Sequence, residues 1–549
     1  MSSLPVLLPD LLSATASPEF RATTKAHGLY NTFQFVLRLS PRIHRVLSEA
    51  SPGVSPARSF EQIQAMSTYL HETMHWWQHI GSTYGFILGL NYPIQTHAVA
   101  GTLKDLIRSA GFKKSVLQHS TLLGTSRMPD VDSPAGRANI IVNNHYDLEL
   151  FRAFTLGPAM AKQAIDKPLF EAVGHALNMT YGHTLHTLGM TVDSSFSAVP
   201  NPDVWQDGFR KLRQEKVPGY FYGSPIELWE IGAHDIFEGQ ARFAQIQYLF
   251  YGSNKKISWQ DFANLGMLDG IYVRAFNSFL AGTESQWPAR VDDPLVGLFL
   301  LVCDMAINPG SGFPFPVQPF FESFITDVNP GARFMMLNRI IALKLPKLKN
   351  AIHNHTREEY ESVTSALSEV IIDYPPLMIA AHFSKWFTST GPLASLRKQY
   401  ENYQFQPMNY VIGHLFAHFL AFQEDKLVNP ECFCWPGPWM SGDRATQKQT
   451  DLFEKHSALF IDKENDDGVF PRLQNGRDEK VVHEAYEQFY DNTACYDLTG
   501  QWIRESGPFR YDLSWLSPSA AESDVENYMR GAFQSAFDVD PADADIIVE

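Results

Sequence analysis

The chain has 549 residues, which is long enough for two or three domains or for one large catalytic domain with insertions. Of these residues 44% are hydrophobic and 13% aromatic, as expected for a folded globular protein. Its net charge of -16 excludes general electrostatic binding of nucleic acid. Four cysteines are too few for a disulfide framework, and Met1 to Pro5 lacks the basic start of a secretory signal, so we predict a cytoplasmic protein. The longest apolar run, Leu295 to Cys303, is far shorter than the roughly 20 residues of a membrane span, so no membrane association is expected.

In residues 31–59 the sequence predicts a strand, a short helix and a connector. Residues 31–39 place Phe33, Phe35, Leu37 and Leu39 on one face, which predicts a strand. Ser40-Pro41 predicts the start of a short helix, and the stretch rich in Ser, Pro and Gly from Ser48 to Ser59 predicts a connector.

The next helix carries the clearest start signal in the chain. Ser59 and Gln62 are spaced as a capping box, and apolar residues then recur at steps of three and four up to Trp77. This helix contains His71-Glu72-Thr73-Met74-His75. Two His residues four apart lie one turn apart on the same face, so both imidazoles can reach one metal ion.

A second helix is predicted from the capping box of Ser224-Pro225-Ile226-Glu227 to Tyr251-Gly252. It carries Glu238, the best candidate for a third metal ligand, in the run Phe-Glu-Gly-Gln-Ala-Arg. Gly232 and Gly239, seven residues apart, are expected to permit close approach of the two helices. His234, one turn before Glu238, is the main rival ligand and otherwise a supporting residue outside the coordination sphere; Glu149 is a further substitute.

The rest of the chain gives coarser predictions. Asn139 to Asn143 predicts a short strand, 261–425 is mainly helical, and 437–480 is polar and loop-like. The last 33 residues hold eight acidic groups and only Arg530 as a base, which predicts an amphipathic helix and an acidic tail. The tail, or the long insertion between the two ligand helices, is a candidate lid over the site.

The motif His71-Glu72-x-x-His75 with a downstream Glu238-Gly239-x-Ala241 resembles the gluzincin group of zinc metallopeptidases. The resemblance covers about 25 residues. It implies His71, His75 and Glu238 as ligands of Zn²⁺ and Glu72 as general base and proton shuttle. It also implies a sheet before the active helix, whose edge strand binds an extended peptide. Candidates for stabilising the oxyanion are Tyr410, His414 and His418, although the aromatic face around the two His favours core packing.

Together these features predict an α+β fold that is predominantly α-helical, with a zincin-like catalytic core, a small N-terminal sheet and large helical additions. We divide the chain into a strand and short-helix region (1–58), the catalytic core with its long insertion (59–260), a helical domain (261–435) and a loop-rich region with the acidic tail (436–549). The predicted function is zinc-dependent hydrolysis of peptide bonds, with a protein or peptide substrate and room for a regulatory protein partner.

Two other ligand schemes do not fit the sequence, and two other functions are alternatives to peptide hydrolysis. His79 lies about 12 Å of helix rise from His71, too far to share one tetrahedral ion, and a metzincin would need Gly and His where Gln78 and Gly81 stand. A dimetal carboxylate oxidoreductase would need a second Glu-x-x-His, but the other Glu and His pairs are four residues apart. The remaining alternative is a helical interaction or regulatory protein whose metal site is degenerate or structural.

Overall fold

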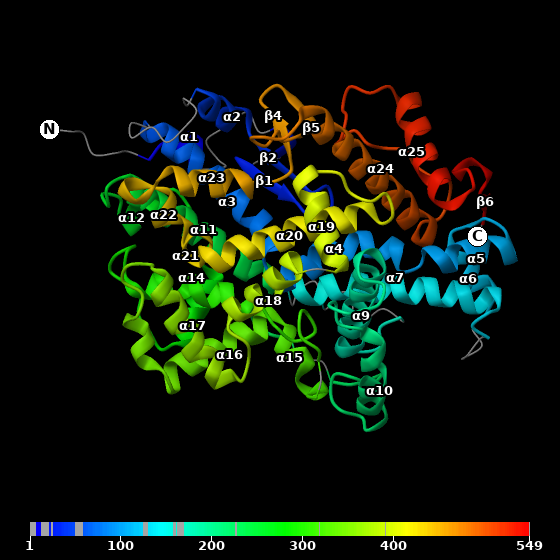
Figure 1. The fold of residues 1–549 in the computed structure, drawn as a ribbon, viewed down its shortest axis with the longest axis horizontal. Helices are drawn as coiled ribbons and strands as arrows, with labels where there is room; N and C mark the ends of the chain where they lie inside the picture. The colour runs from blue at the N-terminus through cyan, green and yellow to red at the C-terminus, as the bar shows by residue number, and fades with distance from the viewer. Residues whose placement is uncertain are drawn as a thin grey trace.

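The computed structural model describes residues 7–12, 21–23, 26–49, 59–124, 130–157, 161, 169–225, 228–317, 319–389 and 391–547. The predicted connector 48–59 and the Ile226-Glu227 part of the second capping box lie mostly outside these residues. The fold is α+β and dominated by helices, as predicted, with a small mixed sheet near the N-terminus (Figure 1).

The helices up to the second ligand helix are α1 (Pro9–Leu12), α2 (Pro41–Ser48), α3 (Phe60–Gly81), α4 (Thr83–His97), α5 (Ala100–Ala110), α6 (Val116–Leu122), α7 (Pro134–Leu156), α9 (Val173–Val192), α10 (Gln206–Gln214) and α11 (Ala233–Gly252). Those that follow are α12 (Trp259–Asn264), α13 (Ile271–Gly282), α14 (Pro294–Ala306), α15 (Phe324–Val328), α16 (Pro330–Leu343), α17 (Arg357–Ile371), α18 (Pro376–Thr388), α19 (Pro392–Asn402), α20 (Tyr410–Val428), α21 (Pro430–Cys434), α22 (Pro436–Met440), α23 (Gln447–Lys455), α24 (Glu479–Arg504) and α25 (Glu522–Phe537). The strands are β1 (Gly28–Asn31), β2 (Val36–Leu39), β3 (Lys113–Lys114), β4 (Phe460–Lys463), β5 (Asp466–Pro471) and β6 (Asp545–Ile546).

The main sheet has the order β1-β2-β4-β5 and joins segments far apart in the sequence. β1 pairs antiparallel with β2, and β2 pairs parallel with β4, so Val36 and Leu37 lie opposite Phe460 and Ile461. All four residues of β2 are buried, and β2 pairs with a strand on each side. β1 is an edge strand, and its second edge has no strand partner among the described residues. Figure 1 shows β1 and β2 beside β4 and β5 above α3.

The predicted strand 31–39 is wrong in its first half. Residues 32–35 form a turn between β1 and β2, because the Asn31 side chain accepts hydrogen bonds from the backbone N–H groups of Phe33 and Gln34, both at 3.0 Å. Phe35 has a positive φ of 56°, which reverses the chain. The two-residue period therefore spans a hairpin and not one continuous strand.

Two further local predictions are wrong. The predicted strand Asn139 to Asn143 lies inside α7, which the cap of Ser133 and the following Pro134 begin upstream. The predicted loop 437–480 contains α23, β4 and β5, because β4 finds a partner in β2 that the local sequence does not reveal. By contrast, the helical character of 261–425 is confirmed by α12 to α20.

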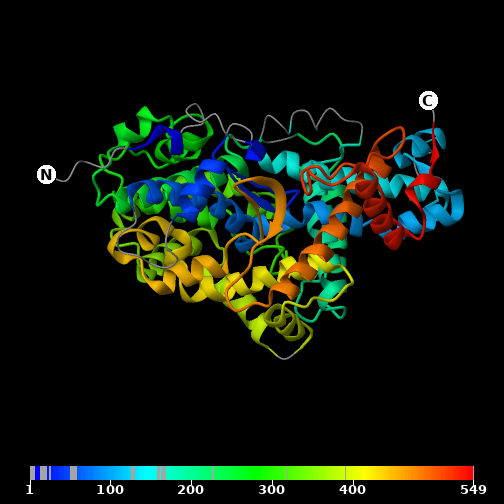
Figure 2. The ribbon, with the colours of Figure 1, turned by 90° about the horizontal axis from the view of Figure 1, so that it is seen from above.

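The C-terminal segment forms the predicted amphipathic helix. α25 buries Met529, Phe533 and Phe537 and packs on α24, and β6 after it pairs with β3. Figures 1 and 2 show α25 and β6 at one end of the molecule. No helix in the described part of the chain is long and apolar enough to cross a membrane.

A buried ion pair ties α20 to α14. Lys426 Nζ lies 2.7 Å from Asp304 Oδ1, and the hydroxyl of Tyr360 on α17 donates to Asp304 Oδ2 at 2.6 Å. Lys426 and Asp304 are only 3% and 6% exposed. Removing one partner of such a pair leaves the other as an uncompensated buried charge.

We expect Lys426→Met to lower the free energy of unfolding by about 3–5 kcal/mol, measured by urea denaturation. Lys480→Met is the control, since Lys480 lies on the surface of α24 with its side chain 84% exposed and should change stability by no more than about 0.5 kcal/mol. Equal stability of the two variants would contradict the role given to the Lys426 ion pair.

Candidate metal centre

The two helices that carry the ligand candidates pack directly against each other. α3 begins where the sequence predicts: the Ser59 hydroxyl accepts a hydrogen bond from the N–H of Gln62, and the Gln62 side-chain oxygen accepts one from the N–H of Ser59. α11 ends at Gly252 as predicted but begins at Ala233, later than the Ser224 box implies. Ser224 does not cap a helix, because its hydroxyl accepts a hydrogen bond from the N–H of Gly219 at 2.5 Å.

The two glycines of α11 do not serve the contact for which they were predicted. A Cβ added to Gly239 would lie 3.1 Å from Ala275 Cβ and 3.3 Å from Phe299, on α13 and α14 and not on α3. Gly232 precedes the helix, and a Cβ added to it would lie 2.7 Å from the carbonyl oxygen of Leu156. The expectation that they let α3 and α11 approach is therefore wrong.

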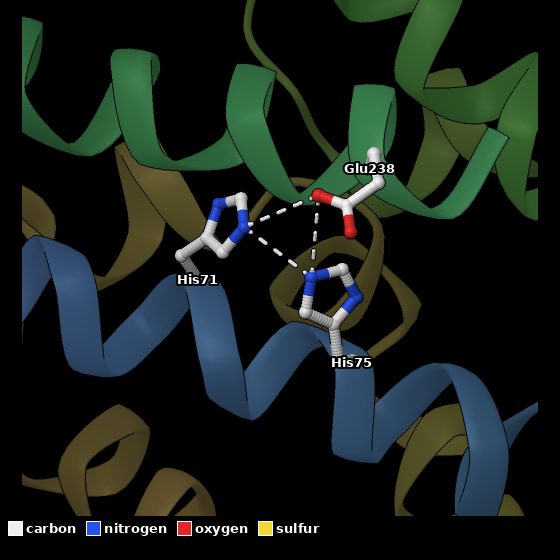
Figure 3. A group of neighbouring side chains, drawn as sticks. All are labelled: His71, His75 and Glu238. Carbon is white, nitrogen blue, oxygen red and sulfur yellow. Dashed lines mark hydrogen bonds and ion pairs between the residues drawn. The ribbon is translucent and has the colours of Figure 1, made fainter. Parts of the chain in front are cut away.

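Three side chains converge between these helices: His71 and His75 from α3 and Glu238 from α11 (Figure 3). The Nε2 atoms of His71 and His75 are 3.3 Å apart, and each lies 3.6 Å from Glu238 Oε2. Bonds of about 2.0–2.1 Å to a tetrahedral Zn²⁺ place neighbouring ligand atoms about 3.3–3.4 Å apart. The three atoms therefore fit three corners of a tetrahedral site, and within the described residues they are the one group of three able to hold a metal ion.

Gln78 sets the orientation of His75. The Gln78 amide nitrogen donates to the carbonyl oxygen of Phe237 and to Gln240 Oε1, both at 2.9 Å, so its oxygen must face His75 Nδ1, which is also 2.9 Å away. Nδ1 of neutral His75 is then the protonated nitrogen, and Nε2 keeps its lone pair toward His71 and Glu238. This is the tautomer that metal ligation requires. Gln78 stands three residues after His75, and that spacing could have revealed it from the sequence.

The charges of the cluster are strongly coupled. Burial lowers the pKa of His71 to about 4. Burial also acts to lower the pKa of His75, but the Glu238 carboxylate outweighs it and raises that pKa to about 9. The two imidazoles in turn hold the pKa of Glu238 well below its usual range, against its burial. The Glu238 carboxylate is thus the member of the triad that favours a positive charge beside it.

Glu72 lies beside the triad and is nearly enclosed. It is 6% exposed, and burial raises its pKa to about 7, opposed by the nearby His75 and by a hydrogen bond from the backbone of Tyr30. A carboxyl group with a pKa near neutrality can take and return a proton at physiological pH.

The triad and Glu72 line a cavity of about 440 Å³. Its other walls come from β1 and the turn after it, from α4 and α7 in the long insertion, and from Phe237 and Tyr272. The described part of the acidic tail contributes no lining residue, so the tail does not cover the site in this structure. The insertion instead supplies part of the cavity wall.

The structure separates the remaining candidates. His234 lines the cavity one turn before Glu238, with Nδ1 4.0 Å from Glu238 Oε1, and stands outside the group of three. Glu149 lies outside the group of three: it pairs with Arg504 at 3.7 Å and does not line the cavity. His79 also lies outside the ligand group, although its ring lines the cavity between Tyr30 and Phe237.

Tyr410, His414 and His418 do not line the cavity, so the oxyanion role suggested for them finds no support there. They lie on α20 within an aromatic cluster, where His414 stacks on Phe405 at 4.2 Å between ring centroids. Tyr272 does line the cavity, and its ring centroid lies 6.1 Å from that of His71, under the guanidinium of Arg242. Sequence reasoning missed Tyr272, because only tertiary packing brings α13 to the site. Arg242 caps this ring and forms no ion pair with Glu238.

β1 touches the general-base candidate directly. A Cβ added to Gly28 would lie 2.4 Å from Glu72 Cγ and 2.6 Å from its Oε1, so glycine is the residue that lets the edge strand approach Glu72.

We expect Gly28→Ala to displace the Glu72 carboxylate and to lower the rate of the predicted peptide hydrolysis about 100-fold, with metal content unchanged, because a small misplacement of a general base is costly. Metal analysis and turnover measured on the same preparation check this. Gly101→Ala is the matched control, since no atom lies within 4 Å of the added Cβ. Full activity in Gly28→Ala would show that Glu72 tolerates the collision or has no part in turnover.

Comparison of the chain with protein-family models, with curated proteins and with solved structures found no match. The functional interpretation therefore depends on the geometry of this site.

Proposed function

We propose that this protein is a zinc-dependent peptidase that uses Glu72 as general base. The observation that carries the proposal is the arrangement of three ligand atoms at tetrahedral spacing, from two packed helices, with Glu72 beside them in one cavity. The donor set of two imidazoles and one carboxylate is that of a catalytic zinc with an open fourth position. A zinc ion held there lowers the pKa of water and polarises a carbonyl group.

Each residue of the site then has a defined task. His71, His75 and Glu238 hold the ion, and Gln78 keeps His75 in the ligating tautomer. Glu72 takes a proton from the attacking water and passes it to the leaving amine nitrogen. Tyr272 is our candidate for hydrogen bonding to the oxyanion, since it lines the cavity next to His71.

The free edge of β1 supports a peptide as substrate. β1 lines the cavity and has a strand partner only on its β2 side among the described residues. Such an edge can pair with the backbone of an extended peptide without regard to its side chains. A candidate zinc site at one wall of the cavity and a strand edge at another are suited to the hydrolysis of peptide bonds. A dimetal oxidation is favoured less, because the described residues offer no second group of metal ligands.

The direct test is incubation of the zinc-loaded protein with a peptide library, with mass spectrometry to detect new chain ends. We expect cleavage that a chelator abolishes and added zinc restores. A zinc-loaded, folded protein that cleaves no member of the library would refute the proposal. A preparation that is folded but binds no zinc would favour an interaction protein.

A further inference from the structure

A cationic side chain lies in the same cavity, away from the metal triad. Arg152 on α7 lines the cavity together with Leu88 and Tyr92 of α4 and Phe33 of the turn after β1. Its guanidinium carbon lies 4.8 Å from the centroid of the Phe33 ring, which covers one face of the group. This part of the wall is therefore aromatic and positively charged.

Arg152 forms no ion pair among the described residues. Its one hydrogen bond there runs from Nη2 to Gln95 Oε1 at 3.4 Å, and its Nη1 is buried without any partner. Glu149 is the acidic group whose charge acts on it most strongly, but that carboxylate pairs with Arg504. Burial lowers the pKa of Arg152 to about 10, so the side chain stays protonated at neutral pH. A buried guanidinium with five donors and so few acceptors favours binding of an anion.

β1 connects this cation to the catalytic group. Gly28 at its start packs on Glu72, and Phe33 just after its end packs on Arg152. Extended chain rises about 3.3 Å per residue, so the backbone positions of Gly28 and Phe33, five residues apart, lie within about 17 Å of each other. A short peptide lying along the edge of β1 can therefore reach both Glu72 and Arg152.

We propose that Arg152 binds a carboxylate of the peptide substrate; this rests on the proposed peptidase function. The planar fork of an arginine matches a carboxylate through two parallel hydrogen bonds. A peptide paired antiparallel to β1 places an acidic side chain from the N-terminal side of the cleaved bond at Arg152. Parallel pairing places the substrate's C-terminal carboxylate there instead.

The test measures binding in a Glu72→Gln background, in which peptides are held without being cleaved. Fluorescent peptides that differ only by Glu or Gln on the N-terminal side, each with a free or amidated C-terminus, are titrated by anisotropy. We expect one of the two carboxylates to strengthen binding by about 10–100-fold, as hydrogen bonds to charged groups do. The side-chain pair and the terminal pair identify which carboxylate is bound.

Substitution of Arg152 then tests the assignment. Arg152→Met should remove the preference, and Arg152→Lys, which keeps a charge and the aliphatic stem against Phe33, should retain part of it. Arg108→Met, on the exposed face of α5, should keep the full preference. The inference is overturned if binding is equal within both the Glu/Gln pair and the free/amidated pair, if the preference survives in Arg152→Met, or if no peptide binds. Cleavage by the wild type without a preference for either carboxylate would leave the peptidase proposal standing, whereas an Arg152-dependent preference without cleavage would refute the peptidase proposal alone.

Discussion

Replacing Glu72 by glutamine should leave zinc bound and lower peptide hydrolysis by about 10²–10⁴-fold, the usual contribution of a positioned general base. Glutamine has nearly the shape of glutamate but cannot accept the proton. Glu72 is not one of the three atoms at tetrahedral spacing, so the ligand set stays intact. Zinc content by elemental analysis and initial rates on one peptide, measured on the same preparation, check both parts.

Outcomes for this variant separate two roles of Glu72. Retained hydrolysis with zinc bound would contradict the assignment of Glu72 as the general base. Loss of both zinc and hydrolysis would show instead that Glu72 supports the metal centre. Wild-type stability, measured alongside by thermal unfolding, excludes collapse of the buried pocket as the cause.

Replacing Glu238 by alanine should lower zinc affinity by more than about 100-fold. Loss of a residue that merely orients a ligand typically costs 10–100-fold, and Glu238 is placed as a ligand itself, 3.6 Å from both imidazole nitrogens. Its carboxylate also acts to raise the pKa of both His71 and His75. Competition with a chromogenic chelator measures the change in affinity.

The two rival ligands from the sequence serve as matched controls for Glu238→Ala. Glu149→Ala breaks an ion pair with Arg504, and His234→Ala removes a residue beside the cluster, so both should bind zinc like the wild type. Zinc binding unchanged in Glu238→Ala, or lost in His234→Ala, would show that the ligand set is assigned wrongly.

The features that could be predicted from the sequence are those whose causes are local. The capping box at Ser59 and the spacing of His71 and His75 depend only on neighbouring residues, and both are found as predicted. Glu238 could be proposed because a helix with an acidic residue in a recognisable context follows later in the chain. The α+β, helix-dominated class follows from periodicity over many helices.

Some of the errors have local causes that the hydrophobic pattern does not show, and others have tertiary causes. The alternation of 31–39 does not show that Asn31 caps a turn, and the apolar run at 139–143 resembles a strand until its helix start at Ser133 is considered. Ser224 has a capping sequence, but its hydroxyl is taken by Gly219. Arg152 and Tyr272 become part of the site only when α7 and α13 pack around the cavity. The division of the chain into four regions stays a prediction.

The parallel pairing of β2 with β4 has a consequence for the biosynthesis of the protein. Val36 and Leu37 pair with Phe460 and Ile461, so the sheet that contains β1 is complete only after residues 460 and 461 have been synthesised. On a ribosome, His71, His75 and Glu238 emerge long before those residues. A chain interrupted before β4 therefore carries all three members of the candidate metal group but lacks one of the two strands that pair with β2.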